Sequence, residues 1–394
     1  MPWKISDGEQ ARRRFVQERL ARNSGASMTE LCRRHGISRE CGHKWWRRFC
    51  AGGWVQLADR THRSVAADER RTLWWPRVLA AVRACREFGP KKLRWKLRQD
   101  HPRVRLPSVR TLARWLRQAG KVRRQKRRAR PGPARPLPGR LRGRCVNDVW
   151  TVDLKGSFRT ADGRRTQPLT VRDLASRFPL AVRHVASARE GPIGAVLQAL
   201  FRRHGLPKAL RIDNGNPFGG GGPRGWTKLT VGWVKLGIRI EYGRPRCPQD
   251  NAEHEQMHRV LKAQTAQPPG ANVQAQQKRS DRWRRRYAER RPHESLDQRT
   301  PASVYRASKR RLPEKPPQWT YPPNWSLLRP DRKGRVRWRQ RTRLIGRAFS
   351  EELLGAKPLN ADTLAVYFGP HLLGTLHAHD QAGLRPVQWR KPKP

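Results

Sequence analysis

The chain has 394 residues, with 88 Lys and Arg against 30 Asp and Glu, so its formal net charge is +58. Such a charge opposes compaction unless a polyanion neutralises it, which favours a nucleic-acid partner bound in a salt-dependent way. We expect neither a membrane protein nor a secreted one, because no apolar run approaches ~18 residues and the first residues contain no apolar signal region. Six scattered Cys residues do not resemble a disulfide framework, which favours a reducing, intracellular compartment. At about 100–200 residues per domain, the length predicts two to four domains.

Residues 1–62 are predicted to form a first helix-turn-helix domain. Ser27-x-x-Glu30 is a capping box that opens an apolar-periodic stretch, Gly36 follows as a turn, and Ser38 can cap the next helix. Helix, glycine turn and helix is the helix-turn-helix pattern. The last helix carries a basic set that we expect to bind DNA: Arg39, His43, Lys44 and Arg47.

Residues 75–120 repeat the pattern and are predicted to form a second helix-turn-helix-like domain. Val78, Leu79 and Val82 are spaced as one helix face, and Ser108 can cap a last helix. The residues of that helix that we expect to bind DNA are Arg110, Arg114 and Arg117.

Residues 121–145 are basic and contain interspersed Pro and Gly. This composition cannot build a core and predicts an extended linker. The linker is either a solvated tether or an arm that adds phosphate contacts, and its position beside two DNA-binding units favours the second interpretation.

Residues 146–310 are predicted to form a layered α/β or α+β domain. The expected strands and helices alternate along the chain: strands at 149–154, 167–173 and 180–185 in a meander, a helix at 193–202, strands at 209–213 and 239–242, and a helix at 251–263. Residues 333–378 alternate as short strands with Gly turns, which favours a small β-barrel. Residues 379–394 are expected to be a disordered tail.

Three carboxylates lie where chemistry can use them. Asp153 lies inside an apolar strand, Asp213 ends a short strand, and Glu255 lies at the start of a helix. Open α/β sheets place their sites at the carboxyl ends of strands, although a strand-end Asp is often only a cap. Clustered carboxylates repel unless a divalent cation lies among them, and oxygen ligands suit Mg²⁺ or Mn²⁺. Two such ions ~4 Å apart would clamp the attacking and leaving oxygens of a phosphodiester displacement.

These acids belong to an ordered set of motifs. The set comprises Trp150-Thr-Val-Asp153-Leu-Lys-Gly, Thr170-Val-Arg-Asp173, Arg211-Ile-Asp213-Asn-Gly and Pro248-Gln-Asp-Asn-Ala-x-x-Glu255, flanked by Gly36-Ile-Ser-Arg39, Gly89-Pro-Lys-Lys and Arg291-Pro-His-Glu-Ser-Leu. It resembles the catalytic core of retroviral-type integrases, and is most similar to bacterial insertion-sequence transposases with a DDE active site. The resemblance covers nearly the whole chain.

The resemblance implies an RNase H-like catalytic domain between N-terminal helix-turn-helix units and a small SH3-like β-barrel. It implies that Asp153, Asp213 and Glu255 hold two Mg²⁺ or Mn²⁺ ions and catalyse DNA strand cleavage and strand transfer. The implied partners are double-stranded DNA, from both element ends and target, and further copies of the chain assembled on that DNA. The implied location is the bacterial cytoplasm, at the nucleoid.

Four details remain open in the sequence. The 42-residue step from Asp213 to Glu255 is longer than in the best-known integrases, and an insertion at residues 219–226 would explain it. Glu253 rivals Glu255, because residues two apart lie about 200° apart on a helix and only one can face a metal. Lys262 suits a DNA phosphate or is a solvated lysine. His258 either supports the site or lies on the surface.

Two further interpretations concern side chains outside the three carboxylates. Asp173 is interpreted as a structural acid that pairs with Arg177. Cys32-x-x-His35 and Cys41-x-His43 have residue types that bind Zn²⁺. The helix-turn-helix pattern instead predicts that Cys32 points inward, and Cys41-x-His43 is poor zinc spacing.

The alternative functions belong to other classes. A DNA-binding protein without chemistry, such as a repressor, would use the helical units and the charge, but leaves the central acids unexplained. A decayed, inactive transposase would also fit the unusual Arg content. A nuclease acting on RNA·DNA hybrids would share the fold, but would not explain the N-terminal DNA-binding units.

Overall fold

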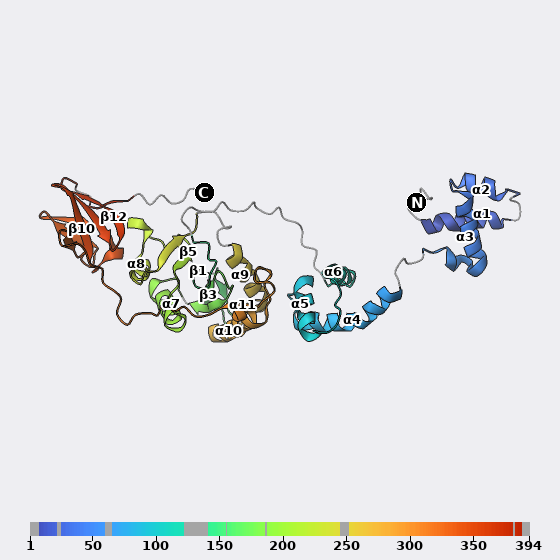
Figure 1. Ribbon diagram of the computed structural model, residues 1–394, viewed down its shortest axis with the longest axis horizontal. Coiled ribbons are helices and arrows are strands. Elements are labelled where there is room, and N and C mark those ends of the chain that lie inside the picture. The colour runs from blue at the N-terminus through green and yellow to red at the C-terminus, as the bar shows by residue number, and fades with distance from the viewer. Residues whose placement is uncertain are drawn as a thin grey trace. The chain divides into compact units, whose positions relative to one another are not determined.

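The computed structural model describes residues 8–21, 25–59, 65–121, 141–154, 156–185, 187–244, 252–380 and 383–387. The chain divides into two compact units, one up to Leu116 and one from Arg117 onward, and each is described by itself (Figure 1). Among the described residues, no helix has the length and apolar character needed to cross a bilayer.

The first helical group contains α1 (Gly8–Leu20), α2 (Met28–Arg34), α3 (Arg39–Gly52) and the 3₁₀ turn η1 (Gly53–Leu57). Ser27 and Ser38 cap α2 and α3 as predicted, because their hydroxyls accept the backbone N–H of Glu30 and Cys41. The helices enclose a small apolar core formed by Phe15, Val16, Leu31, Cys32, Trp45 and Leu57.

The second helical group contains α4 (Val65–Ala84), α5 (Pro90–Asp100) and α6 (Val109–Gln118). Helix α4 begins before the expected start at residue 75. The group has its own core, which includes Trp74, Val78, Leu93, Leu97, Leu112 and Trp115. Residues 122–140 of the expected linker lie outside the described residues.

The central domain is built on a mixed sheet. Its strands are β1 (Val149–Leu154), β2 (Phe158–Arg159), β3 (Arg165–Asp173), β4 (Pro179–Val185), β5 (Ala209–Ile212) and β6 (Arg239–Tyr242). The strands lie in the order β2-β3-β1-β5-β6, and β4 also pairs with β3. The predicted meander β1–β3–β4 is antiparallel, and β5 and β6 add in parallel beside β1.

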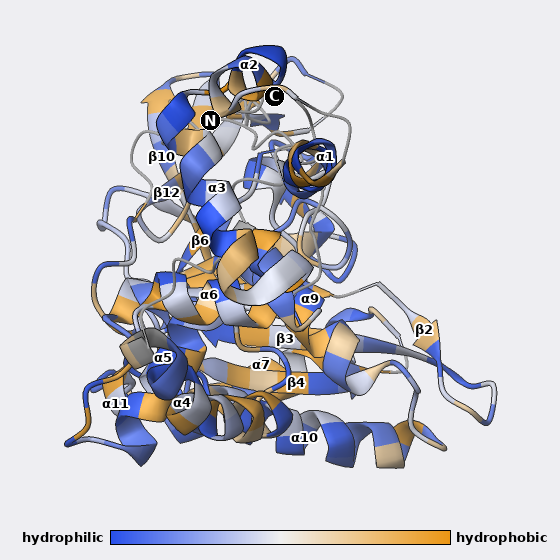
Figure 2. Cartoon of the chain, turned by 90° about the vertical axis from the view of Figure 1, so that its right-hand side faces the viewer, coloured by the Kyte–Doolittle hydropathy of each residue, from blue (hydrophilic) through white to orange (hydrophobic). Residues whose placement is uncertain are grey.

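Helices cover both faces of this sheet (Figure 2). They are α7 (Glu190–His204), α8 (Lys228–Lys235), α9 (Ala252–Thr265), α10 (Val273–Arg290) and the short α11 (Pro301–Val304). Trp150 stacks on Phe201 of α7, whereas the next residue, Thr151, contacts His254 of α9. Because successive strand residues point to opposite faces, α7 and α9 lie on opposite sides of β1.

The described C-terminal strands form an open sheet, and the expected small β-barrel is not shown. They are β7 (Ser326–Leu328), β8 (Arg335–Trp338), β9 (Arg341–Leu344), β10 (Leu354–Asn360), β11 (Thr363–Phe368), β12 (His371–His377) and β13 (Arg385–Pro386). Five of them pair in the order β13-β12-β11-β10-β7, and β8 and β9 form a separate hairpin. The described strands β7 and β13 therefore remain edges. Alternating short strands specify pairing between neighbours along the chain, and do not specify whether the first and last strands meet.

Part of the expected disordered tail is ordered. Strand β13 pairs with Gly374 and Thr375 of β12. A Cβ at position 374 would lie 2.1 Å from the Arg385 carbonyl oxygen, so this approach requires glycine. Residues 381–382 and 388–394 of the predicted tail lie outside the described residues.

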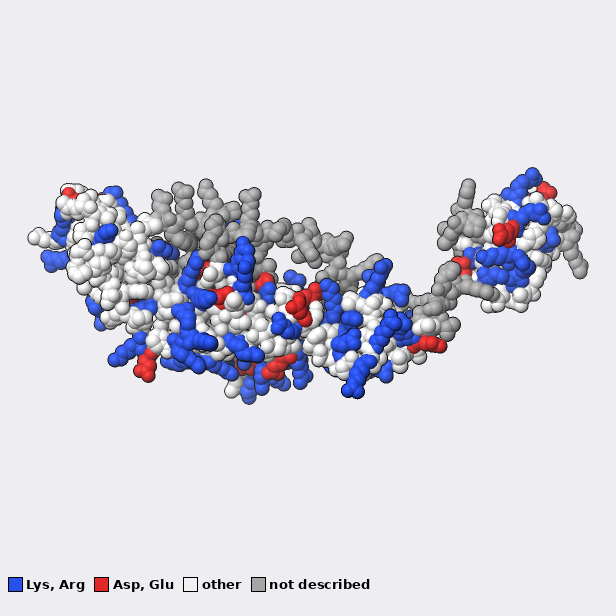
Figure 3. Space-filling model, in the orientation of Figure 1, with Lys and Arg blue, Asp and Glu red and all other residues white. Residues whose placement is uncertain are grey.

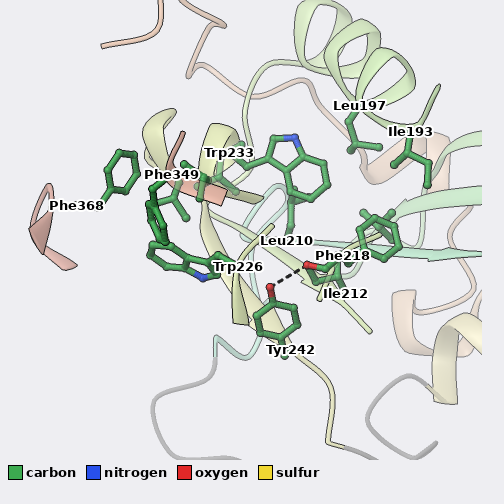
Figure 4. Close-up of a cluster of buried hydrophobic side chains, with 14 of the residues drawn as sticks. Ile193, Leu197, Leu210, Ile212, Phe218, Trp226, Trp233, Tyr242, Phe349 and Phe368 are labelled. Carbon is green, nitrogen blue, oxygen red and sulfur yellow. Dashed lines mark hydrogen bonds between the residues drawn. The ribbon is translucent and has the colours of Figure 1, made fainter. Parts of the chain in front are cut away.

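The segment after Asp213 joins the central domain to the C-terminal sheet. The ring centre of Trp226 lies 6.2 Å from that of Phe349 and 5.3 Å from that of His371. Arg224 Nε donates to the Leu372 carbonyl at 3.0 Å. Figure 4 shows Trp226 beside Phe349, with Phe368 beyond, in one apolar core shared by both parts. The extra residues expected as a loop insertion thus form an interdomain contact.

We predict a pH-dependent contribution to stability from His184, which joins β4 to β3 and α10. Its Nδ1 lies 3.1 Å from Thr166 Oγ1 and its Nε2 lies 2.8 Å from Ser280 Oγ. Burial lowers the pKa of His184 to about 4, below its ordinary value near 6.5. Near neutral pH and below, the folded state therefore binds fewer protons than the unfolded state. The contribution of neutral His184 to the free energy of unfolding is complete above about pH 6.5 and is lost as the pH falls towards 4. At pH 5 the loss is about 2 kcal/mol.

Urea unfolding at pH 7 and pH 5 tests this prediction by comparing the wild type with His184→Gln. In the variant, the difference in the free energy of unfolding between pH 7 and pH 5 should be smaller than in the wild type by about 2 kcal/mol. An unchanged pH dependence would contradict it.

Candidate active site

Asp153 and Asp213 lie at the carboxyl ends of two neighbouring parallel strands. Strands β1 and β5 pair with Thr151 opposite Arg211. Asp153 lies two residues beyond this last pair on β1, and Asp213 lies two residues beyond it, directly after β5. The Asp153 side chain is 24% exposed and Asp213 is exposed. The structure therefore brings two of the three predicted carboxylates to one solvent-accessible edge.

Glu255 lies on the first turn of α9, beside the contact between this helix and Asp153. Helix α9 buries His254, Met257 and His258, whereas Glu255 is exposed. His258 Nδ1 lies 3.5 Å from Asp153 Oδ2. Residues three apart are neighbours on a helix surface, so Glu255 lies next to the residue that contacts Asp153.

The rival acid, Glu253, is held by two arginines. Its carboxylate forms a close ion pair with Arg177 Nη1 and lies 3.5 Å from Arg172 Nη2. The buried Arg172 also donates to the Glu253 carbonyl at 2.5 Å. These contacts give Glu253 a structural role and favour Glu255 as the acid available to a metal.

Asp173 has a different partner set from the one expected. Its carboxylate accepts the backbone N–H of Asn147 at 2.7 Å, and both the N–H and the hydroxyl of Ser176. Arg177 instead pairs with Glu253. Asp173 is still a structural acid, but its carboxylate holds the turn at Ser176 and the backbone of Asn147, and does not pair with Arg177. Burial raises the pKa of its carboxyl group, against these hydrogen bonds.

A buried network of two histidines and two threonines supports Asp153 from behind. Thr170 Oγ1 donates to the Asp153 carbonyl at 3.0 Å, and lies 2.7 Å from His254 Nε2 and 2.6 Å from His258 Nε2. Because the hydroxyl has a single proton, both histidines must donate to it through Nε2. His254 Nδ1 then accepts the hydroxyl of Thr151, 2.8 Å away.

Burial, and then the neighbouring His258 and Arg172, lower the pKa of His254 well below its ordinary value. His254 is therefore neutral at pH 7, as the network requires. His258 is 3% exposed, so it is a supporting residue and not a surface residue. His254 and Thr170 were not among the residues predicted from the sequence. The one signal for the network is the i, i+4 spacing of the two histidines on the predicted helix.

Asp153 and Asp213 offer the oxygen donors that Mg²⁺ and Mn²⁺ prefer. Although Asp213 is exposed, the protein around its carboxylate removes part of its hydration and raises its pKa, while the Gly215 N–H, which donates to the carboxylate at 3.3 Å, acts in the opposite direction. A cation beside this carboxylate would offset the cost of that lost hydration. Among the described residues, however, no three His, Cys, Asp or Glu side chains are gathered closely enough to share one ion. The oxygen donors of Asp153 and Asp213 fit a divalent cation. Among the described residues, Glu255 does not lie close enough to them to complete a site with three ligands.

The alternative zinc residues belong to the fold of the first helical group. Cys32 is buried in its core, as the helix-turn-helix pattern predicts. His35 Nε2 lies 3.2 Å from Glu18 Oε2.

The residues predicted to bind DNA all lie on exposed surfaces. Arg39, His43, Lys44 and Arg47 are exposed on α3; Arg110, Arg114 and Arg117 are exposed on α6; and Lys262 is exposed on α9. Figure 3 shows that Lys and Arg outnumber Asp and Glu on the visible face of both units. Their contacts with DNA remain predictions.

Comparisons with known proteins identify two parts of the chain. Residues 236–301 match an integrase core domain, and residues 11–64 match a helix-turn-helix domain. The chain is also 28% identical, over 232 residues, to "Insertion element IS476 uncharacterized 39.2 kDa protein" of Xanthomonas euvesicatoria. This match covers 57% of the chain and 62% of that relative. The chain is thus similar to an insertion-element protein, and residues 236–301 are similar to part of an integrase core. The predicted resemblance to insertion-sequence transposases is thereby confirmed.

Solved structures with some similarity come from retroviruses. The simian T-cell lymphotropic virus intasome in complex with PP2A regulatory subunit B56 gamma matches with 16% identity and a TM-score of 0.36, over 60% of this chain and 78% of that chain. The HTLV-2 integrase catalytic core domain in complex with magnesium matches with 14% identity and a TM-score of 0.33, over 42% of this chain and all of that chain. These scores are low, so the assignment depends on the sequence matches.

The network behind Asp153 predicts the effect of Thr170→Val. This substitution keeps the shape of the side chain, but leaves two imidazole N–H groups and a carbonyl without their shared partner. We expect the free energy of unfolding to fall by about 1–3 kcal/mol, measured by urea unfolding. Thr375→Val, on the half-exposed hydroxyl beside His377 of β12, is the matched control and should change it by less than about 0.5 kcal/mol. Equally small losses in both variants would show that the network does not stabilise the site.

Proposed function

We propose that this protein is a transposase that cleaves DNA at the ends of an insertion sequence and joins those ends to target DNA. The observation that supports this most strongly is the parallel pairing of β1 with β5, because Asp153 and Asp213 each follow two residues after its last pair, Thr151 and Arg211. A repressor would have no need for two solvent-accessible acids at the edge of a mixed sheet, in a chain with so few acids.

The side chains divide the work as follows. Asp153 and Asp213 would hold Mg²⁺ or Mn²⁺, with Glu255 as the third carboxylate and not Glu253. When bound, the cation would make water or a 3′-hydroxyl a stronger nucleophile and stabilise charge on the phosphate. Thr170 and His258 hold Asp153 in place. Lys262, at i+7 from Glu255, would contact a phosphate of the bound strand.

The remaining domains would bring the DNA to this site. The exposed basic residues of α3 and α6 would recognise element ends, with base contacts in the major groove and phosphate contacts beside them. The hairpin β8–β9, with exposed Arg337 and Arg339, would add contacts without sequence preference. Two element ends must be brought together, and the resemblance implies assembly, so we propose that copies of the chain assemble on DNA, in the bacterial cytoplasm at the nucleoid.

Strand cleavage and joining with Mg²⁺ tests this function, on labelled DNA that carries the ends flanking the gene. Glu255→Gln should reduce both products roughly a hundredfold or more, because even outer partners of metal ligands cost 10–100-fold. Glu253→Gln is the matched variant. It should keep activity within a few-fold of wild type but lower thermal stability, because the buried Arg172 loses its acid.

The opposite pattern, with activity lost in Glu253→Gln and kept in Glu255→Gln, would exchange the two roles. DNA binding without product from the wild type would support the repressor or decayed-transposase alternative.

The salt dependence of DNA binding tests the role of α3. Replacing Arg39, Lys44 and Arg47 with Ala should weaken binding of an element end, and should reduce the slope of log affinity against log salt by roughly one for each phosphate that the variant no longer neutralises. Fluorescence anisotropy at several salt concentrations measures both quantities. Arg14→Ala, exposed on α1, is the control and should leave the slope unchanged. Equal slopes in all three proteins would remove α3 from the DNA interface.

A further inference from the structure

The first residues of β3 pair with β2 in a short hairpin, residues 157–166, which we call the β2–β3 hairpin. Phe158 lies opposite Thr166, and Arg159 lies opposite Arg165. Thr166 is buried, whereas both arginines are exposed. Figure 2 shows the hairpin projecting to one side of the central domain, with a hydrophilic turn at its tip.

The β2–β3 hairpin lies beyond the end of the sheet that carries Asp153. Asp153 pairs with Thr170 of the antiparallel strand β3, so the residues that precede Thr170 on β3 run past the carboxyl end of β1. Arg165 is five residues before Thr170. At ~3.3 Å per residue, the backbone of Arg165 lies up to about 16 Å along the strand from that of Thr170.

The two arginines form a cross-strand pair of like charge. Like charges directly opposite each other on two strands are destabilising. The hydrogen bonds of both side chains go to neutral groups: Arg159 Nη1 donates to the Gly163 carbonyl at 2.7 Å, and Arg165 Nε donates to Ser157 Oγ at 2.8 Å.

The acids of the described residues leave this pair uncompensated. The one acid within the hairpin is Asp162, whose carboxylate accepts the Thr160 hydroxyl at 2.5 Å and lies 3.9 Å from Arg164 Nε. No Asp or Glu of the described ranges forms an ion pair with Arg159 or Arg165. Two exposed guanidinium groups side by side, without an acid, suit an anion with several oxygens, such as a phosphate.

The turn of the hairpin is held by the loop between α9 and α10. The backbone N–H groups of Ala161 and Asp162 donate to the carbonyls of Gly270 and Ala271, each at 3.0 Å. Gln276 is completely buried, and its Oε1 accepts the Gly270 N–H at 2.7 Å. The hairpin is therefore fixed to the domain before any ligand binds, which reduces the conformational entropy that binding would cost.

We propose that Arg159 and Arg165 together bind one phosphate of a DNA strand that extends to Asp153 and Asp213. A phosphate between the two guanidinium groups replaces their mutual repulsion with charge-assisted hydrogen bonds. With a rise of ~3.4 Å per base step, the 16 Å span corresponds to about five steps between this phosphate and the carboxylates. The inference rests on the proposed function in that DNA is bound at these carboxylates, and it makes both arginines positioning residues.

Binding without catalysis tests the pair. The full chain in EDTA is titrated with labelled DNA that carries an element end. Arg159→Ala and Arg165→Ala should each weaken binding about tenfold, and Arg165→Lys should weaken it less, because the charge is kept. Arg202→Ala, exposed on α7 outside the hairpin, is the matched control and should stay within about twofold of wild type. Equal losses in Arg165→Ala and Arg202→Ala, or no loss in either, would overturn the proposal.

Thermal unfolding without DNA separates binding from folding. Arg165→Ala removes one of two like charges, so its unfolding midpoint should equal or exceed that of wild type. A lower midpoint together with weaker DNA binding would assign Arg165 a structural role and overturn the proposal.

Neutral phosphates identify the contact itself. Single phosphates of the element-end DNA are replaced, one at a time, by methylphosphonates. One replacement, about five steps from the element terminus, should weaken binding by the wild type. On that DNA, Arg159→Ala and Arg165→Ala should bind as tightly as the wild type, because the shared partner is already neutral. The absence of such a position, or a different position for each arginine, contradicts the proposal.

Mg²⁺-dependent cleavage of the unmodified DNA is measured separately. Cleavage by the wild type without a sensitive phosphate rejects the hairpin contact and keeps the proposed function. A sensitive phosphate shared by both arginines, without any cleavage, supports the hairpin contact and rejects the catalytic function, so the two failures are distinguishable.

Discussion

The parallel pairing of β1 with β5 is the contact on which the rest of the candidate site depends. Leu210 and Ile212 are buried on β5 and Val152 is buried on β1, so apolar burial fixes the register. The backbone N–H groups of Lys208 and Ala209 extend the pairing through the carbonyls of Asn147 and Asp148. A slip of one residue would turn every side chain of β5 to the opposite face. The positions of the two acids are thus determined by the apolar residues beside them.

The scarcity of acids makes the placement of each one informative. Glu253 neutralises arginines on β3 and on the turn after it. Glu241 is buried against Arg211 at 3.0 Å, and both side chains hydrogen-bond the backbone of Leu141. This ion pair fixes where the chain enters the central domain, close to Asp213. Buried pairs contribute little net stability but are costly to break, so their main effect here is to fix position.

The sequence predicted what depends on local pattern. Strands β1, β3 and β5 and helix α9 follow from apolar periodicity. The position of Asp153 follows from its apolar strand, and that of Asp213 from the end of a short strand. What it could not predict depends on contacts between distant segments. The motif that ends at Glu255 favours this acid over Glu253, but only the contacts with Arg172 and Arg177 show what Glu253 does instead. The same reason explains the missed network of Thr170 and His254, which joins β3 to α9, and the open C-terminal sheet, whose edge pairing no local pattern records.

The shared core around Trp226 has a mechanical consequence. The C-terminal sheet and the carboxylates of the central sheet belong to one packed body, because Trp226 and Arg224 join the segment after Asp213 to η5 (Arg347–Phe349) and β12. The distance between the hairpin β8–β9 and the carboxylate edge is therefore fixed by the packing of this body. Under the proposed function, a DNA strand bound by the hairpin would therefore reach Asp153 and Asp213 at a fixed distance.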